Sequence, residues 1–136
     1  MRPQIIVETV VNAPIEKIWA YWTEPEHITQ WNNASSNWHT PRVENDLKVG
    51  GKFKARMEAK DGSSGFDFEG TYTAVAEQEK IEYVLADGRK VIVEFLPQNG
   101  RIMMRETFDA ENMNSLEMQK SGWQSILENF KKHVEG

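Results

Sequence analysis

Residues 114–134, NSLEMQKSGWQSILENFKKHV, form the longest amphipathic segment of the chain. Apolar side chains recur in it every three or four residues, which is the spacing of one face of an α-helix. Asn114 is a favourable N-cap with Glu117 three residues later, and Met113 and Met118 occupy the positions of a hydrophobic staple. We therefore predict a helix ~30 Å long that needs a partner surface for its apolar stripe. The stripe consists of Leu116, Trp123, Ile126, Leu127, Phe130 and Val134.

Most of the preceding chain alternates apolar and polar side chains, as half-buried β-strands do. Asp87-Gly88 and Asn99-Gly100 are dipeptides that favour two-residue hairpin turns, because both central positions of such turns need a positive φ. Consecutive strands joined by hairpins pair antiparallel. The expected strands are Gln4–Val11, Val43–Val49, Lys52–Ala59, Phe66–Ala74, Ile81–Leu85, Val91–Phe95 and Arg101–Phe108.

Two short helices are expected after the first strand. Pro14 suits the first turn of one helix, and Thr23 with Glu26 fits a capping box for a second helix that ends near Trp31. The predicted class is α+β, with an antiparallel sheet of six to seven strands and one long helix to cover its apolar face. Because one helix must cover the whole face, the sheet has to curl around it, and incomplete contact would leave a cavity.

Size and composition limit the possible functions. The 136 residues fit one domain, 1–136, and the absence of cysteine excludes disulfides and thiolate metal sites. The net charge of −5 and the scattered basic residues argue against nucleic acid as a partner. No apolar run approaches the ~20 residues of a membrane span, and no secretory signal is visible, so we expect a cytoplasmic monomer.

Several stretches together resemble the SRPBCC superfamily, also called START-like or helix-grip. The opening resemblance lies in Asn12–Trp19, Thr23–Glu26 and Trp31. Other stretches resemble the subfamily that is named for the activator of the heat-shock-protein-90 ATPase. They are Glu44–Gly51, Asp61-Gly62, Phe68–Tyr72, Glu106–Phe108, Gly122-Trp123 and Leu127–Phe130.

This resemblance implies a helix-grip fold with a hydrophobic cavity between the sheet and the C-terminal helix. Relatives bind lipids, polyketides, plant hormones or flavonoid-like molecules, and some are cyclases or aromatases. The eukaryotic co-chaperone, which links the subfamily to stress response, has an additional N-terminal domain for which 136 residues leave no room. The resemblance therefore predicts a pocket, but it supplies no catalytic residues and no cofactor.

Glu106 is the most informative single residue, because it shares a strand face with Ile102, Met104 and Phe108. Burial without a partner would raise its pKa, and a protonated Glu106 could donate a hydrogen bond to a ligand or act as a general acid. Alternatively, a bulge shifts the register, or Glu106 pairs with one of three side chains. These are Arg105, Arg56 and Gln119.

Gln119 and Gly122 lie on one side of the C-terminal helix, on adjacent turns. Gly122 inside a helix would be explained by the close approach of a ligand or strand, or by packing of Trp123 against the sheet. Gln119 is a candidate polar anchor in the pocket wall, or a partly exposed residue on the flank of the helix.

The remaining candidates for a ligand-binding face are apolar and aromatic side chains that the alternation places inward. They would describe a pocket or an ordinary core equally well. This set is Phe53, Met57, Phe68, Tyr72, Tyr83, Val93, Phe95, Met104 and Trp123. Trp22, Trp31 and Trp38 are expected to form a mobile lid, a patch for a protein partner or a small satellite core. The separated residues His27, His39 and His133 predict no metal site.

Three functions are compatible with these features. The first is the binding of a small hydrophobic ligand such as a lipid, polyketide or flavonoid-like molecule. The second is a protein-interaction module related to co-chaperones. The third is a lyase, cyclase or hydrolase that uses Glu106 as an acid or base.

Overall fold

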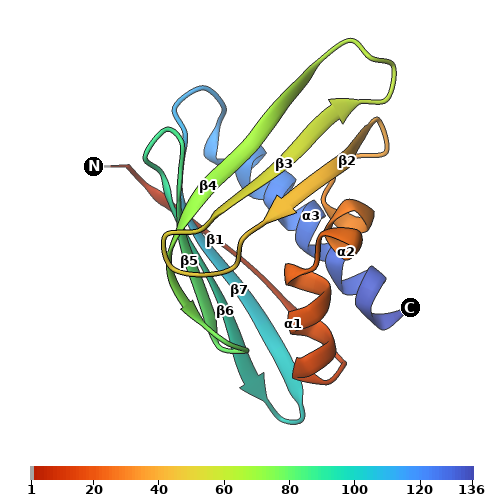
Figure 1. Ribbon diagram of the computed structural model, residues 1–136, viewed down its shortest axis with the longest axis vertical. Coiled ribbons are helices and arrows are strands. Elements are labelled where there is room, and N and C mark those ends of the chain that lie inside the picture. The colour runs from red at the N-terminus through yellow and green to blue at the C-terminus, as the bar shows by residue number, and fades with distance from the viewer. Residues whose placement is uncertain (1) are drawn as a thin grey trace.

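The fold combines one curled antiparallel sheet with a long C-terminal helix (Figure 1). The computed structural model describes residues 2–136. In chain order the elements are β1 (Gln4–Val11), α1 (Ile15–Thr23), α2 (Pro25–Trp31), β2 (Trp38–Asn45), β3 (Lys52–Ala59), β4 (Gly65–Ala76), β5 (Lys80–Leu85), β6 (Lys90–Gln98), β7 (Arg101–Asp109) and α3 (Leu116–Glu135). The predicted α+β helix-grip architecture is confirmed.

The seven strands are ordered β1-β7-β6-β5-β4-β3-β2, and every neighbouring pair is antiparallel. The pairing register shifts between Tyr72 and Ala74 in β4, and between His39 and Arg42 in β2. Such irregularities bend a strand and increase its twist, which helps the sheet to curl. Figure 1 shows α3 running along the inner side of the sheet, while α1 and α2 lie at the open side.

The C-terminal half of α3 anchors the core. Leu127, Phe130 and Val134 are fully buried, as the predicted stripe requires. The ring of Phe130 meets Trp22 and Trp31 edge-on, with centroids 4.8 and 5.0 Å away. One helix thus holds both the sheet and the two short helices together. Among the described residues, no helix is long and apolar enough to cross a membrane.

The start of α3 differs from the prediction. Ser115, and not Asn114, is the N-cap, and its hydroxyl accepts a hydrogen bond from the Met118 amide at 3.1 Å. The Asn114 side chain instead donates to Glu111. With the cap displaced by one residue the predicted staple does not form, so Met113 and Met118 are 88% and 63% exposed. Leu116, which was expected in the buried stripe, is 49% exposed.

Other local predictions were also wrong. Thr23 does not cap α2, because its hydroxyl donates to the Trp19 carbonyl within α1. The strand expected at Val43–Val49 runs instead from Trp38 to Asn45. At Asp87-Gly88 only the glycine has a positive φ, whereas both residues of Asn99-Gly100 do, as a two-residue turn requires.

Replacement of the N-cap tests the corrected start of α3. Ser115→Ala removes the oxygen that satisfies the Met118 amide, so we expect a loss of about 1 kcal/mol in unfolding free energy. Asn114→Ala is the matched control and should cost less, because Asn114 caps nothing. Urea denaturation of both variants measures the difference, and a larger loss in the Asn114 variant would show that the helix begins one residue earlier.

Candidate functional site

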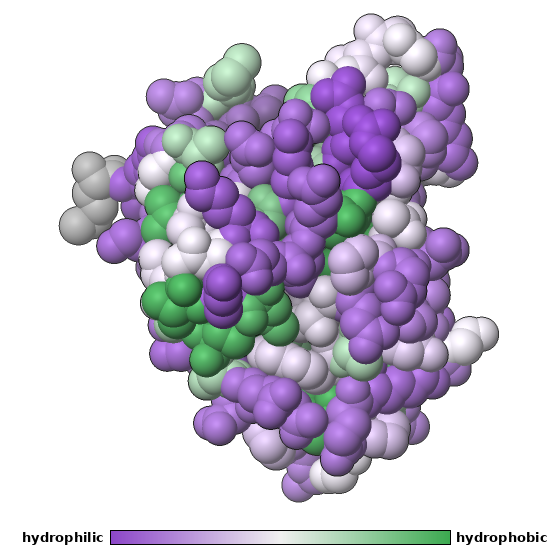
Figure 2. Space-filling model, viewed as in Figure 1, coloured by the Kyte–Doolittle hydropathy of each residue, from purple (hydrophilic) through white to green (hydrophobic). Residues whose placement is uncertain are grey.

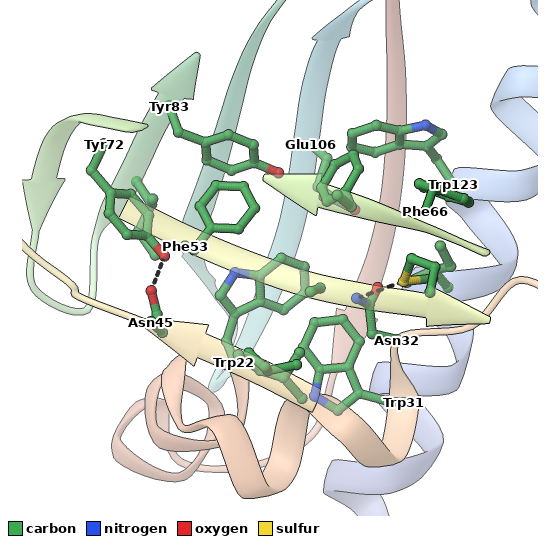
Figure 3. Close-up of a pocket in the computed structure, with 17 residues that line it drawn as sticks. Trp22, Trp31, Asn32, Asn45, Phe53, Phe66, Tyr72, Tyr83, Glu106 and Trp123 are labelled. Carbon is green, nitrogen blue, oxygen red and sulfur yellow. Dashed lines mark hydrogen bonds between the residues drawn. The ribbon is translucent and has the colours of Figure 1, made fainter. Parts of the chain in front are cut away.

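A cavity of about 240 Å³ lies between the sheet, α2 and α3 (Figure 3). Its lining comes from all three helices and from strands β2 to β5 and β7. The lining residues are Trp22, Ile28, Trp31, Asn32, Val43, Asn45, Phe53, Ala55, Met57, Phe66, Phe68, Tyr72, Ile81, Tyr83, Glu106, Trp123 and Ile126.

Aromatic rings form much of the wall. The stacked rings of Trp22 and Trp31 close the side next to the short helices, with centroids 4.7 Å apart. On the sheet, the Phe53 ring lies against Tyr83 with centroids 4.7 Å apart, and it also covers Gly70. A Cβ atom on Gly70 would come within 2.9 Å of the Phe53 ring, so glycine is what allows this ring to lie flat on β4.

Two polar groups in the wall satisfy each other. The Tyr72 hydroxyl donates to the Asn45 side-chain oxygen, and the Asn45 amide donates to the Thr23 carbonyl at 2.7 Å. Burial raises the pKa of Tyr72, so its hydroxyl stays protonated. This chain of hydrogen bonds joins β4 and β2 to the end of α1, and it leaves little capacity for a ligand.

Unlike Tyr72 and Asn45, Glu106 has no hydrogen bond or ion pair with any residue between 2 and 136, although it is only 4% exposed. The register of β7 is continuous with both neighbouring strands, so no bulge turns the side chain away from the cavity. Burial raises the pKa of Glu106 to about 8, which means that the carboxyl is mostly neutral at pH 7.

The partners considered for Glu106 in the sequence are occupied elsewhere. Arg105 pairs with Glu8 and Glu94, and Arg56 pairs with Glu58 and Asp67, all on the outer face of the sheet. The third candidate partner, Gln119, is hydrogen-bonded to Glu111 and Asn114, just before the start of α3. Of the alternatives that the sequence left open, the structure has the Glu106 carboxyl buried on the inner face of the sheet.

Tyr83 is a second unpaired polar group at the cavity. Its side chain is buried, and its hydroxyl has no hydrogen-bond partner among residues 2–136. Burial raises its pKa, and the nearby Glu106 carboxylate adds to the effect. In Figure 3 the hydroxyl of Tyr83 points into the same space that Glu106 faces.

Gln119 and Gly122 do not belong to the cavity lining. The amide of Gln119 accepts from the Glu111 backbone N–H at 2.9 Å and donates to the carbonyls of Glu111 and Asn114. Gln119 is thus a brace for the β7–α3 connection. A Cβ atom on Gly122 would meet nothing within 4 Å, so no strand of the sheet approaches it closely.

Most of the other predicted residues are where the alternation placed them. Phe53, Met57, Phe68, Tyr72, Tyr83 and Trp123 line the cavity. Val93, Phe95 and Met104 are inward-facing but lie in the closed core, outside the cavity. Trp38 also lies outside it and packs near Phe66, with ring centroids 5.9 Å apart.

The structure adds residues that the sequence did not single out as site residues. Trp22 and Trp31 were expected in a lid, a patch or a satellite core, and here they form part of the cavity wall. Alternation on β3 and the apolar stripe of α3 already placed Ala55 and Ile126 inward. No pattern in the sequence indicated Asn32 and Asn45, because loop and strand-end residues carry no periodic signal.

The histidines do not all stand apart, contrary to the sequence analysis. His27 Nδ1 of α2 lies 3.1 Å from His133 Nε2 of α3, and Tyr21 stacks on His27 with centroids 3.8 Å apart. Burial lowers the pKa of His133, with the charges of His27 and Lys17 as further causes. The pair fastens α2, which carries one cavity wall, to α3.

Glu24, Glu26 and His27 have potential ligand atoms within 4.8 Å of one another, at the start of α2. Both carboxylates are exposed, and exposed acidic groups are common on protein surfaces without a metal. The second nitrogen of His27 is already engaged by His133. These residues therefore give no reason to place a metal centre there.

The buried carboxyl predicts a particular dependence of stability on pH. Because the pKa of Glu106 is raised from 4.5 to about 8 by folding, its unfavourable contribution is absent below pH 4.5 and complete above pH 8. Glu106→Gln should therefore gain about 3 kcal/mol relative to the wild type between pH 5 and pH 8. Urea denaturation across this range measures it, with the exposed Glu77→Gln as control. Parallel stability curves for the Glu106 variant and the wild type would contradict a buried, unpaired carboxyl.

Comparison with known proteins agrees with this fold. The sequence pattern of the family described as activator of Hsp90 ATPase homolog 1-like protein matches residues 12–135. The solution structure of an AHSA1-like protein from Aeromonas hydrophila is 46% identical, with a TM-score of 0.91, and the match covers 98% of this chain and 92% of that one. A comparison with curated proteins gave no match.

Two further structures extend the similarity. A protein from Cytophaga hutchinsonii is 49% identical with a TM-score of 0.86, over 97% of this chain and 92% of that one. Protein CV1439 from Chromobacterium violaceum shares the fold at 21% identity, with a TM-score of 0.88 over 98% and 99% of the two chains. The chain therefore belongs to the family of activator of Hsp90 ATPase homolog 1-like proteins, within the SRPBCC superfamily.

Proposed function

We propose that this protein reversibly binds a small hydrophobic molecule in the cavity between the sheet and α3. The observation that carries the proposal is an internal space of about 240 Å³ whose wall is mostly aromatic and aliphatic. Pockets of this character, with a few polar groups at defined places, are typical of small-molecule sites. Lipid, polyketide and flavonoid-like molecules are the classes that this fold suggests.

The energetic cost of the cavity supports the same conclusion. Side chains that line an open space of about 240 Å³ lack packing partners on that side, and water makes few hydrogen bonds with their mostly apolar surface. A ligand that fills it restores the missing van der Waals contacts. The fold tolerates this cost because the core around Phe130 and Val93 is closed and fully buried.

The wall favours binding over catalysis. Glu106 is the one carboxyl among the lining residues, and no histidine, lysine, serine or cysteine stands beside it there. Nucleophilic catalysis needs a nucleophile with an activating base beside it, and the lining residues offer no such pair. Tyrosine hydroxyls with raised pKa values are poor bases, so the arrangement supports a carrier or sensor.

Filling the cavity with a side chain tests the proposal. Ala55 lies on the cavity wall in β3, so Ala55→Phe should abolish binding of hydrophobic compounds. The matched control is Ala34→Phe, which places the same ring on an exposed loop. From a panel of flavonoids, polyketides and fatty acids, each compound that binds should stabilise the wild type and the control by about 2.7 kcal/mol at ~100 times its Kd. If no compound stabilises the wild type, or if Ala55→Phe responds like the control, the proposal is wrong.

A further inference from the structure

We propose that the ligand is uncharged and places an oxygen acceptor, such as a ketone or amide carbonyl, against the Glu106 carboxyl and the Tyr83 hydroxyl. This inference rests on the proposed function, since it concerns the chemistry of the molecule in the same cavity. It narrows the ligand from any hydrophobic compound to one with a defined polar group. It also excludes the acids among the candidate lipids.

The first reason is that two donors in the wall have no acceptor in the part of the chain that the structure describes. Glu106 and Tyr83 are 4% and 9% exposed, and neither forms a hydrogen bond with another residue between 2 and 136. The other buried hydroxyl of the wall, on Tyr72, is bound to Asn45. The oxygens of Glu106 and Tyr83 border the accessible space of the cavity, so an acceptor on a ligand can take up both donated hydrogen bonds.

The second reason is that both groups remain protonated at neutral pH. Burial raises the pKa of Glu106 to about 8 and that of Tyr83 well above its usual value. The lining residues of α1, α2 and α3 carry no charge, and the positive charge of Arg89, which lies outside the cavity wall, only partly offsets the effect of burial at Tyr83. From α3 the cavity receives Trp123 and Ile126, and the titratable groups of its wall are Tyr72, Tyr83 and Glu106. A neutral carboxylic acid in such a site acts as a hydrogen-bond donor.

The third reason is the absence of a cation from the wall. No Lys, Arg or His is among the lining residues, so a carboxylate or phosphate on the ligand would be buried without an opposing charge. Burial of an unpaired charge is strongly unfavourable. An anionic ligand would in addition oppose ionisation of Glu106. The wall therefore discriminates between a ketone and an acid of the same shape.

Three probes of nearly equal size test this discrimination: acetylnaphthalene, ethylnaphthalene and naphthoate. Titration calorimetry at pH 7 should show about tenfold tighter binding of the ketone than of the ethyl compound, as expected for two hydrogen bonds to a neutral acceptor. Naphthoate should bind at least tenfold more weakly than the ketone. Tyr83→Phe should weaken the ketone about fivefold and leave the ethyl compound unchanged.

The pH dependence of ketone affinity can be measured on the wild type alone. It distinguishes the contribution of Glu106 from that of Tyr83, because only Glu106 ionises in this pH range. Because the protonated form of Glu106 donates, affinity for the ketone should fall about fivefold from pH 7 to pH 9, since the ionised form binds the ketone no better than it binds the ethyl compound. Ethylnaphthalene, which needs no donor, should bind equally at both values. In Glu106→Gln, whose amide still donates, the fall for the ketone should disappear.

Equal affinities for the ketone and the ethyl compound, preferred binding of naphthoate, or a pH-independent ketone affinity would each overturn this inference. In those cases the proposed function would stand, because a hydrophobic probe still binds. If neither neutral probe binds, while the Ala55 experiment also gives no response, both the inference and the proposed function are wrong.

Discussion

The structure depends on the uneven contact between one helix and a sheet of seven strands. The C-terminal half of α3 packs completely, because Leu127, Phe130 and Val134 are fully buried against β1 and the short helices. Farther toward its N-terminus, α3 presents Trp123 and Ile126 to a space that the sheet does not fill. The Trp123 ring stacks on Phe108 at 3.8 Å, which sets the separation of helix and sheet at this level. Hydrophobic packing thus fills the space between α3 and the sheet at the C-terminal end of the helix and leaves a cavity nearer its N-terminal end.

At Glu106, the residue that would best stabilise the fold differs from the residue that the candidate site contains. An apolar side chain at this position of β7 would suit the alternation of Met104 and Phe108, and it would avoid the desolvation of a carboxyl. The protein nevertheless has a neutral acid there, while every charged pair at the sheet lies on the outer face or at its edges. Figure 2 shows the same separation from outside: the visible face is mainly hydrophilic, with an apolar area over the β2–β3 connection. Polar groups that burial has shifted in this way occur frequently at functional sites.

The two periodicities of the sequence predicted most of the fold and part of the site. Alternation with period two placed Glu106, Tyr83 and Phe53 on the inner face, because side chains of a strand point to opposite sides. Helical spacing identified the buried side of α3 but not its first turn, where Asn114 and Ser115 are equally good caps by residue type.

The remaining features depend on contacts that join distant segments. His27 and His133 are 106 residues apart, and only the docking of α2 on α3 brings them together. The sequence predicted on which side of the helix Gln119 lies, and this suggested a place in the pocket wall. It did not predict the conformation of the β7–α3 connection, to which the Gln119 side chain is hydrogen-bonded. The register shift at Tyr72 likewise follows from the curvature of the whole sheet.

The central claim is that the space beneath α3 holds a buried carboxyl with no partner among residues 2–136. A titration of the Glu106 carboxyl carbon by NMR, assigned through Glu106→Gln, tests it most directly. The structure predicts that this carbon titrates with a pKa near 8 in the ligand-free protein. A pKa near 4.5, the usual value of a solvated glutamate, would contradict the claim, because Glu106 would then face water or a cation.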